Sequence, residues 1–518
     1  MRLLWPMHYA IAMKNFIEQH IDKIAFTLSC YDRLIITGSL VAVGHADAMT
    51  RFIRQQGIPI FNYPDWANRF REELRAHAES VALAHGVEID FIQRKDFRKE
   101  DRIQEILRHR GDRPGLVHIF SAMEPCTAFK PWHDKQQGKT FLRMSPGKCL
   151  HYYFYFILPE WGLCHLRVPT WAPFRLQFYC NGHNVLARQL QQRKSTYSLH
   201  DNAFISSENP AEAQKLADAF NPARLHTTLD NAVRAYCPIV RHFPGGYHWS
   251  LMQVEYATDI VFKRRADLKP LYEELVCTAV HAVKPEHVAT FLGRTLTEGF
   301  EGELGNDFHT HIQGTRIKHH MGKAAIKMYD KHGIALRIET TTNDVSFFKH
   351  YREVVHRDGS RTLKYAAFKK SIYSLPDLAS VLGDANRRYI GFISAIDDPT
   401  NGIRDLDKVS RPVKADDRTY RGFNLFHGDD LNLFIALVKG EFNISGFRNR
   451  HLRDALKSKT ASQMSAIIRR LRKHGLIKKV IHNYKYYLTG LGRRITVVAL
   501  KLREMFIIPS LRGVITVT

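Results

Sequence analysis

The chain has 518 residues, of which 76 are Lys or Arg and 51 are Asp or Glu, so its formal net charge is +25. At roughly 100–200 residues per domain this length predicts about three or four domains, and a hydrophobic content of 44% excludes a disordered chain. The positive charge exceeds what solubility requires and favours a polyanionic partner, because each neutralised phosphate releases counterions.

We therefore predict nucleic acid as the partner, with DNA first and RNA as the alternative. The sequence has no long apolar span and no amphipathic anchor, so no membrane partner is expected. Its seven cysteines are dispersed without a C-x-x-C pair, which predicts reduced thiols, a cytoplasmic location and no zinc ribbon. Neither a Walker A, a G-x-S-x-G nor a G-x-G-x-x-G motif occurs, so no nucleotide cofactor is expected.

In chain order, the patterns predict a multidomain protein of the α+β or α/β class. Residues 1–145 are predicted to form an amino-terminal α/β domain, because strand-like runs such as "RLIITGSLVAV" alternate with helix-like runs that end at glycine. Residues 146–396 are predicted to form a central antiparallel β-rich domain with helices. This domain includes a meander at 315–344 and a helical stretch over 364–396.

The central domain begins with an aromatic segment, in which "HYYFYF" occupies residues 151–156. Aromatic strands of this kind are typical of a buried core. The alternative is a platform on which single-stranded bases stack, together with Trp161, Trp171 and Phe174.

A turn-rich linker is predicted at 397–427, followed by a carboxy-terminal domain at 428–505 and a tail at 506–518. The order in this domain is helix, helix, helix, hairpin, helix. It carries 17 Lys and Arg residues against 5 Asp and Glu residues, a net charge of +12. The run "IIRRLRKHGLIKKV…NYKYYLTGLGRR" resembles the MarR-type winged-helix families. That resemblance implies a winged helix-turn-helix whose third helix enters the major groove while the wing contacts the backbone.

The candidate nucleic-acid contacts are basic, hydroxyl or amide side chains of this domain. They lie before and on the third helix and on the wing: Arg448, Arg450, Ser462, Gln463, Ser465, Arg469, Arg470, Arg472, Lys473, Lys478, Lys479 and Lys485. Helical spacing places Ile467, Ile468 and Leu471 inward and the neighbouring basic residues outward. A winged helix that contacts a protein is the alternative interpretation.

The segment "TRIKHHMGKAAIKMYDKHGIALRIETTTND" at 315–344 alternates like three antiparallel strands, with a tight turn at His332–Gly333. One face would then carry apolar side chains, namely Ile326, Met328, Leu336 and Ile338. The other would carry the groups for phosphodiester chemistry. We predict that Tyr329 is a nucleophile and that Glu339 is a metal-binding carboxylate. The positive groups that would stabilise phosphate charge are Lys327, Lys331 and Arg337.

A divalent metal, Mg²⁺ or Mn²⁺, is predicted from acids at strand edges that a sheet can bring together. The proposed ligands are Asp32, Glu124, Asp259 and Glu339. Glu255, four positions before Asp259 in the same strand-like run, is a further acid of this kind. An RNase H-like two-metal nuclease or transposase uses acids in this way, whereas the alternative is that they form surface ion pairs.

Two further resemblances bear on function. The pattern "IKMYDK…LRIE" resembles a segment of rolling-circle replication initiators, and His309-Thr310-His311 has the spacing with which HUH nucleases hold a metal. The motifs "YDR", "KCLHYYFYF", "YATD", "IKMYDK…LRIETT" and "GFRNRHLR" occur in this order along the chain. Through them the chain as a whole is similar to a family of bacterial proteins of about 500 residues that end in a winged helix. This last resemblance implies an architecture and not an activity.

These observations favour a metal-dependent enzyme that nicks or transfers DNA strands for a mobile element or replicon, directed to its site by the carboxy-terminal domain. The alternative is a DNA-binding regulator, or a protein that binds structured RNA, without catalysis. A plain regulator seldom needs more than 400 residues before its DNA-binding domain, which favours the enzyme. The sequence leaves the oligomeric state open, and a dimer is compatible with it.

Overall fold

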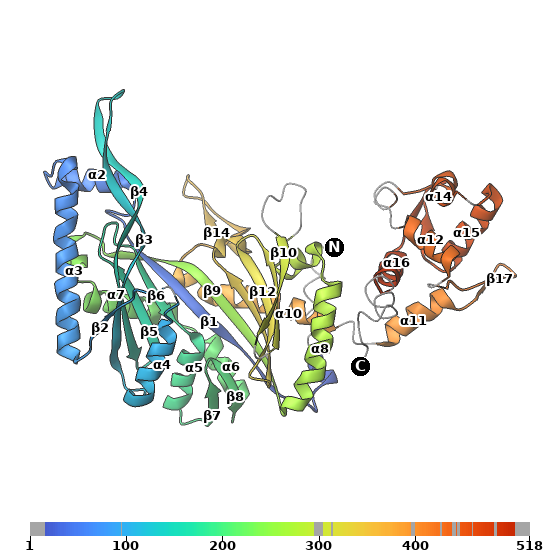
Figure 1. Ribbon diagram of the computed structural model, residues 1–518, viewed down its shortest axis with the longest axis horizontal. Helices are drawn as coiled ribbons and strands as arrows, with labels where there is room; N and C mark the ends of the chain where they lie inside the picture. The colour runs from blue at the N-terminus through green and yellow to red at the C-terminus, as the bar shows by residue number, and fades with distance from the viewer. Residues whose placement is uncertain are drawn as a thin grey trace. The chain divides into compact units, whose positions relative to one another are not determined.

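A computed structural model of the chain divides into two compact units, Met1–Ala395 and Ile396–Thr518, and each is described by itself (Figure 1). The structure describes residues 16–94, 96–294, 304–311, 314–394, 399–424, 427–437, 442, 446–457, 459–480 and 484–502.

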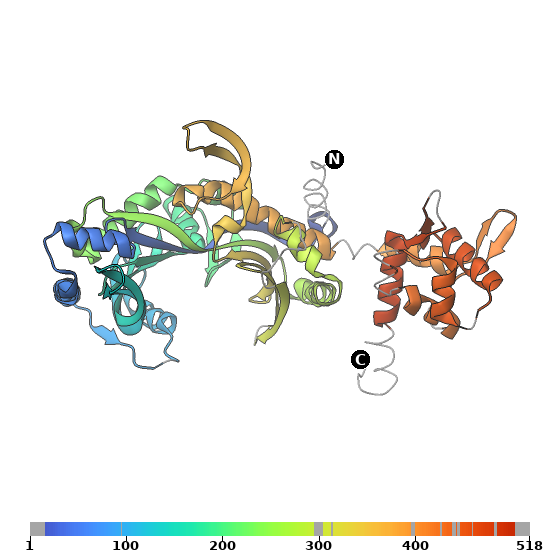
Figure 2. The same cartoon turned by 90° about the horizontal axis from the view of Figure 1, so that it is seen from above.

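The first unit is built on one sheet, to which eleven strands of the described residues belong (Figures 1 and 2). Every pairing in it is antiparallel except that of β2 with β3. From one edge to the other the strands are β10 (Leu304–His311), β11 (Gly314–Met321), β12 (Ala324–Lys331), β13 (Ala335–Thr342), β9 (Tyr247–Phe262), β1 (Ile24–Leu40), β6 (Leu176–Cys180), β5 (Gly162–Pro169), β4 (Lys139–Leu158), β3 (Gly115–Asp134) and β2 (Ile89–Phe91).

The main core lies on one face of this sheet, beneath helices that bury their apolar sides against it. These helices are α2 (Ala46–Gln55), α3 (Tyr63–His85), α7 (Pro222–Tyr236), α8 (Arg265–Ala282), α9 (Pro285–Phe291) and α10 (Leu375–Ser394). The mixed α/β class predicted from the sequence is therefore confirmed. The aromatic strand β4 is buried from Tyr152 to Ile157, which confirms the core interpretation of "HYYFYF".

The opposite face of the sheet is covered only in part, by two smaller apolar clusters. One lies under α5 (Gly182–Gln192), α6 (Pro210–Asp218) and the small hairpin of β7 (Tyr197–His200) and β8 (Ala203–Ser207). The other lies under α4 (Lys99–Arg110). Polar side chains of the central strands can therefore reach this face.

The meander predicted at 315–344 is confirmed by β11, β12 and β13, with His332 and Gly333 at positive φ in the tight turn. The apolar side chains of β12 and β13 are fully buried in the main core, as predicted: Ile326, Met328, Leu336 and Ile338. Period-2 alternation consequently turns Lys327, Tyr329, Arg337 and Glu339 towards the less covered face.

A hairpin of β14 (Lys349–Val355) and β15 (Arg361–Ala367) follows β13 and pairs only with itself among the described strands. The helix predicted over 364–396 is wrong at its start, because α10 begins at Leu375 and residues up to Ala367 belong to β15. In the same unit, β4 runs without a break through residues 145 and 146. The sheet thus joins the two regions that the domain prediction separates there.

The second unit contains α11 (Pro399–Ser410), a hairpin of β16 (Val413–Ala415) and β17 (Arg418–Tyr420), α12 (Gly428–Leu437), α14 (Asn449–Leu456), α15 (Ala461–Lys473), a hairpin of β18 (Ile477–Lys479) and β19 (Tyr486–Leu488), and α16 (Gly490–Leu502). Its first elements occupy the predicted linker, because Val409 and Phe423 are buried in the core of this unit. The third helix begins as predicted: the Thr460 side chain caps it in a reciprocal pair with Gln463. No helix in the described part of the chain is long and apolar enough to cross a bilayer.

Candidate metal centre

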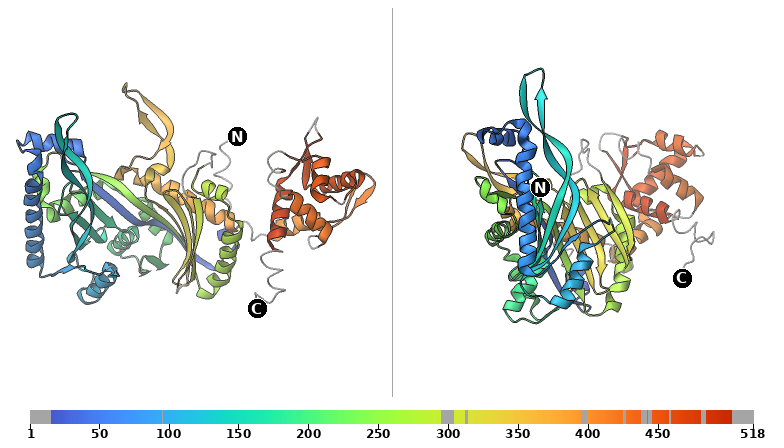
Figure 3. Two further views of the ribbon diagram at one scale, coloured as in Figure 1. Left: turned by 45° about the horizontal axis from the view of Figure 1, so that its top comes forward. Right: turned by 60° about the vertical axis from the view of Figure 1, so that its left-hand side comes forward.

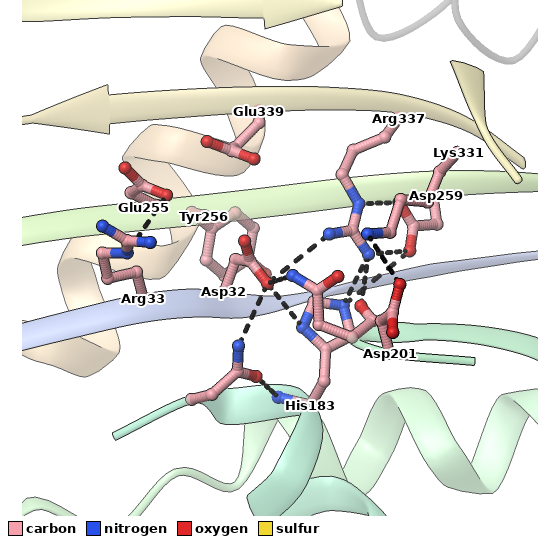
Figure 4. A network of polar contacts seen from close by, with 12 residues as sticks. Asp32, Arg33, His183, Asp201, Glu255, Tyr256, Asp259, Lys331, Arg337 and Glu339 are labelled. Atoms are coloured by element: carbon pink, nitrogen blue, oxygen red, sulfur yellow. Dashed lines mark hydrogen bonds and ion pairs between the residues drawn. The ribbon is translucent and has the colours of Figure 1, made fainter. Parts of the chain in front are cut away.

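Charged side chains meet on the less covered face, across the neighbouring strands β12, β13, β9 and β1 (Figure 4). The strand register places them directly opposite one another. Lys327 faces Glu339, and Arg337 faces Asp259. Since directly opposed residues have Cβ atoms about 5 Å apart, the register alone brings opposite charges into contact.

Three acids form a compact group at this place: Asp32 on β1, Glu255 on β9 and Glu339 on β13. Each can offer a carboxylate oxygen so that the three oxygens lie within 4.8 Å of one another, and all three residues are buried. In the described ranges this is the one group of three or more metal-binding side chains. Oxygen ligands are those that Mg²⁺, Mn²⁺ and Ca²⁺ prefer.

Asp32 reaches the group because β1 is irregular there. Tyr31 pairs with Tyr256 and Arg33 with Glu255, so Asp32 is an extra residue that the partner strand does not match. Such a β-bulge re-aims the side chain of the extra residue. It brings the Asp32 carboxylate beside acids from strands more than 200 positions away in the chain.

The spacing of the carboxylates fits a divalent ion. Oxygen ligands about 2.3–2.6 Å from one Ca²⁺-sized ion lie up to about 5 Å apart, and for Mg²⁺ the limit is about 4 Å. The observed spacing therefore accepts the larger ion directly and requires the side chains to close slightly around Mg²⁺. Rotation about the terminal torsion of a Glu side chain is soft enough for this adjustment.

The carboxylates also repel one another. Burial and the neighbouring Glu339 carboxylate raise the pKa of Glu255 to about 7. Two cations offset part of this repulsion. Lys327 Nζ lies 2.7 Å from Glu339 Oε1 and 3.5 Å from Glu255 Oε1, and Arg33 Nε lies 3.9 Å from Glu255 Oε2. The pKa of Glu255 nevertheless remains raised, and a divalent ion at this place would favour its charged form.

Arg337 lies beside this group and is fully buried. Its guanidinium donates to both carboxylate oxygens of Asp259, at 2.6 and 2.7 Å, and lies 3.5 Å from Asp32 Oδ1. Burial would raise the pKa of Asp259, but Arg337 holds it below its usual range. Asp259 was predicted to be a metal ligand; the structure instead gives both of its oxygens to Arg337.

Asp32 is held from the other side by α5 and the β7–β8 turn. Asn202 donates to Asp32 Oδ1 at 2.5 Å, and His183 Nδ1 lies 3.1 Å from the same oxygen. Although burial opposes ionisation, His183 and Arg337 hold the pKa of Asp32 below its usual range. Asp32 is therefore a charged carboxylate whose second oxygen remains for a ligand.

The start of α5 fixes these contacts. Asn181 caps the helix by accepting from the His183 backbone N–H at 2.8 Å, and its amide donates to Asp32 Oδ1 at 3.3 Å. Gly182 lies so close to β1 that a Cβ there would be 2.3 Å from the Tyr31 carbonyl oxygen. Glycine is therefore required for α5 to approach the acids.

Tyr329 donates a hydrogen bond of 2.6 Å to Glu339 Oε2. Burial and the Glu339 carboxylate raise its pKa well above the usual value, which opposes formation of the phenolate. Lys331 lies 3.8 Å from Asp201, and burial together with Arg337 lowers its pKa. Tyr329 thus lies at the group as predicted, while its role as nucleophile stays a prediction.

Glu124, the fourth predicted ligand, lies elsewhere on the sheet. Its carboxylate accepts from Tyr153 at 2.6 Å and from Arg167 at 2.7 Å, and Lys99 lies 3.7 Å away. Burial would raise its pKa, but Tyr153 and Arg167 lower it. The structure therefore does not bring Glu124 to the other acids, and Glu255 stands in their group instead.

A groove reaches Glu255, one of the three acids, from solvent. Glu255 and Lys327 line it, and the remaining lining residues come mainly from β11, β12, the turn between them, β9 and the end of β13: Gln253, Lys318, His320, Gly322, Lys323, Ala324, Ala325, Thr341 and Asn343. Three lysines and a histidine thus share the groove with the Glu255 carboxylate. Positive groups next to a metal site suit a substrate phosphate.

In the second unit, most predicted contacts reach solvent. The exposed ones are Arg448, Arg450, Ser462, Gln463, Ser465, Arg469, Arg472, Lys478 and Lys479, while Lys473 and Lys485 are half-buried. Arg470 is the exception and corrects the prediction, because it is buried, donates to both oxygens of Asp430 at 2.9 and 3.0 Å and lies over the Phe423 ring.

The predicted pair His309 and His311 lies on β10. The side chains of these two residues fall outside what the structure describes. No statement about metal binding by this pair therefore follows.

Sequence reasoning missed Asn181, His183 and Asn202, and it left Glu255 out of the chosen ligands. Glu255 carried a readable signal, because residues four apart in a strand share a face, as Glu255 and Asp259 do. The others come from a helix cap and a turn, whose positions depend on tertiary contacts.

No family model and no curated protein matches the chain. A distant structural match is found with the rolling-circle replication initiator protein from Geobacillus stearothermophilus, at a TM-score of 0.18 and 11% identity, covering 69% of this chain and 97% of that chain. A likeness of that size does not establish a shared fold. The candidate site is therefore argued from its own residues.

Proposed function

We propose that this protein is a metal-dependent enzyme that cuts or transfers nucleic-acid strands, with DNA as the preferred substrate. The observation that carries the proposal is the convergence of Asp32, Glu255 and Glu339, three buried acids from three strands, of which Glu255 also lines a basic groove. Strand-processing enzymes need such carboxylates to hold a divalent ion against a phosphate.

Each group has a chemical task in this proposal. A bound Mg²⁺ or Mn²⁺ would supply Lewis-acid polarisation of a phosphoryl oxygen. Lys327 lines the groove and touches the acids, so it can stabilise charge that develops on phosphate. Tyr329 is the candidate nucleophile, and loss of its proton requires that positive charge near Glu339 lower its pKa. Arg337 and His183 hold Asp32 and Asp259 in place.

Substrate binding is assigned to the second unit, which we propose to be a winged helix. Three helices, a two-stranded hairpin and a closing helix follow one another there, and α15 exposes Ser462, Gln463, Ser465 and Arg469. The net charge of +12 over residues 428–505 supports contact with a phosphate backbone. In the same proposal, the second unit directs the enzyme to a site of a mobile element or replicon.

A binding protein without catalysis is the second candidate. Lys327, Arg33 and Arg337 already pair with the acids, and such a network can simply be structural. In that case the groove would hold phosphate by its lysines alone. The two candidates differ in whether the acids bind metal.

Calorimetric titration of the full chain with Mn²⁺ tests the proposal, followed by incubation of single-stranded and duplex DNA and of RNA with either metal. We expect one site, which Glu339→Gln and Glu255→Gln weaken more than about 10-fold while abolishing cleavage. Glu73→Gln is the control, because Glu73 is a half-buried acid that pairs with Arg241 and contacts His242 but is not one of the three acids. Nucleic-acid binding without any metal site would establish the second candidate instead.

A further inference from the structure

The β14–β15 hairpin is an arm that projects from the large sheet (Figures 2 and 3). Its seven backbone pairs run from Lys349–Ala367 to Val355–Arg361, and none of its residues pairs with a strand of the sheet in the described part of the chain. An isolated two-stranded hairpin is marginal in water. An arm of this kind therefore suggests a partner that covers it.

One face of the arm exposes large apolar side chains. Tyr351 is 72% exposed, Leu363 73%, Val355 56% and Tyr365 54%. The strand register puts Tyr351 directly opposite Tyr365, with ring centroids 5.3 Å apart. These four share the face with Glu353 and Arg361, which pair with each other at 3.2 Å, and exposed apolar side chains gathered in this way mark interaction sites.

The arm is also basic. Residues 349–367 contain five Lys or Arg and two Asp or Glu, and the basic residues are Lys349, Arg352, Arg357, Arg361 and Lys364. Arg352 stands directly opposite Lys364 on the face away from the tyrosines. Like charges in that position destabilise a hairpin. A polyanion along the arm would remove this repulsion.

The arm starts at the rim of the groove beside the acids. Asn343 and Lys323 line that groove. Asp344, the next residue after Asn343, lies 3.4 Å from Lys323 and 3.2 Å from Lys370, and Phe368 N–H donates to the Phe348 carbonyl at the base of the arm. A chain bound along the arm would thus pass the mouth of the groove.

We infer that the β14–β15 arm holds an unpaired stretch of nucleic acid, with bases stacked on Tyr351 and Tyr365 and phosphates on the arm's lysines and arginines. Exposed aromatic rings among positive charges are the means by which proteins bind single strands. The inference rests on the proposed function for the class of substrate. It adds the place where that substrate is held beside the groove.

The test is fluorescence anisotropy of a labelled single-stranded oligodeoxynucleotide and of its duplex, with the full chain in EDTA. Tyr351→Val with Tyr365→Val removes both rings and keeps residues that favour strands. We expect single-strand affinity to fall at least about 10-fold and duplex affinity less than about 2-fold. The paired Tyr→Phe changes should retain binding, and Leu83→Ala is the control for loss of an exposed apolar side chain on α3.

Unchanged single-strand affinity in the double Val variant overturns the inference, as does an equal loss for both oligonucleotides. Light scattering of the same samples identifies the competing occupant. If the Val variant only converts a dimer to a monomer, the arm binds a second copy of the chain, and the inference is wrong. Because EDTA removes divalent metal, this binding test does not depend on the metal centre. Binding to the arm can therefore be confirmed even if the protein does not cleave DNA, and cleavage can be confirmed even if the arm does not bind.

Discussion

The two oxygens of Glu339 are held by two different residues of the neighbouring strand. Tyr329 donates to Oε2 at 2.6 Å, and Lys327 Nζ lies 2.7 Å from Oε1. Both come from β12, at positions two residues apart and therefore on one face. Glu339 is thus the point at which a phenol, an ammonium and the acids Asp32 and Glu255 meet.

Tyr329→Phe is expected to remove a covalent protein–DNA adduct while leaving Mn²⁺ binding within about 3-fold, because the phenol donates to Glu339 and is not one of the acids. Denaturing gels of a labelled oligonucleotide after incubation detect the adduct. Tyr153→Phe is the matched control, since Tyr153 also donates to a glutamate at 2.6 Å. Each change should cost about 1–2 kcal/mol of stability. Normal cleavage by Tyr329→Phe would identify water as the nucleophile.

Lys327→Met should make the stability of the first unit depend on divalent metal. The change removes the ammonium from Glu255 and Glu339, which leaves buried like charges together and costs about 2 kcal/mol. Mg²⁺ or Ca²⁺ should then raise the melting temperature of the variant more than that of the wild type. Thermal unfolding with and without each metal measures this. Equal shifts in both proteins would mean that the ion binds elsewhere.

The sequence predicted the faces of β12 and β13 and the turn between them, because strand alternation is local. It did not predict which acids converge, since that depends on β9 lying between β13 and β1. Asp32 joins through a bulge, and Glu124 is distant because β6, β5 and β4 separate β1 from β3. Arg470 is a second case in which tertiary contacts decide. Its position on the helix predicted an exposed side chain, but the side chain is buried where it pairs with Asp430 from another helix.

Two buried histidines of the first unit should make it lose stability in acid. Burial lowers the pKa of His151 and of His319 to about 4, whereas the unfolded value is about 6.5. At these two positions the folded state therefore binds fewer protons, so their contribution to stability falls as the pH drops from about 6.5 to 4, by up to about 3 kcal/mol for each histidine, while protonation of Glu255, whose pKa is raised, acts in the opposite direction. Urea unfolding at several pH values measures the loss. His319→Gln should flatten the curve, whereas the exposed His109→Gln should not.

Substitutions of two adjacent arginines of α15 should have different effects, one on DNA binding and the other on stability. Arg469 is exposed, so Arg469→Gln should weaken binding to all DNA sequences and reduce the salt dependence by about one counterion, with little change in stability. Arg470 is buried in a two-bond pair with Asp430, so Arg470→Gln should cost about 3–5 kcal/mol of stability. Anisotropy at several salt concentrations and urea unfolding separate the two effects. A large loss of stability in Arg469→Gln, or none in Arg470→Gln, would contradict the observed packing of the helix. If Arg469→Gln weakens DNA binding while the protein stays folded, the result would support the assignment of this surface to nucleic acid.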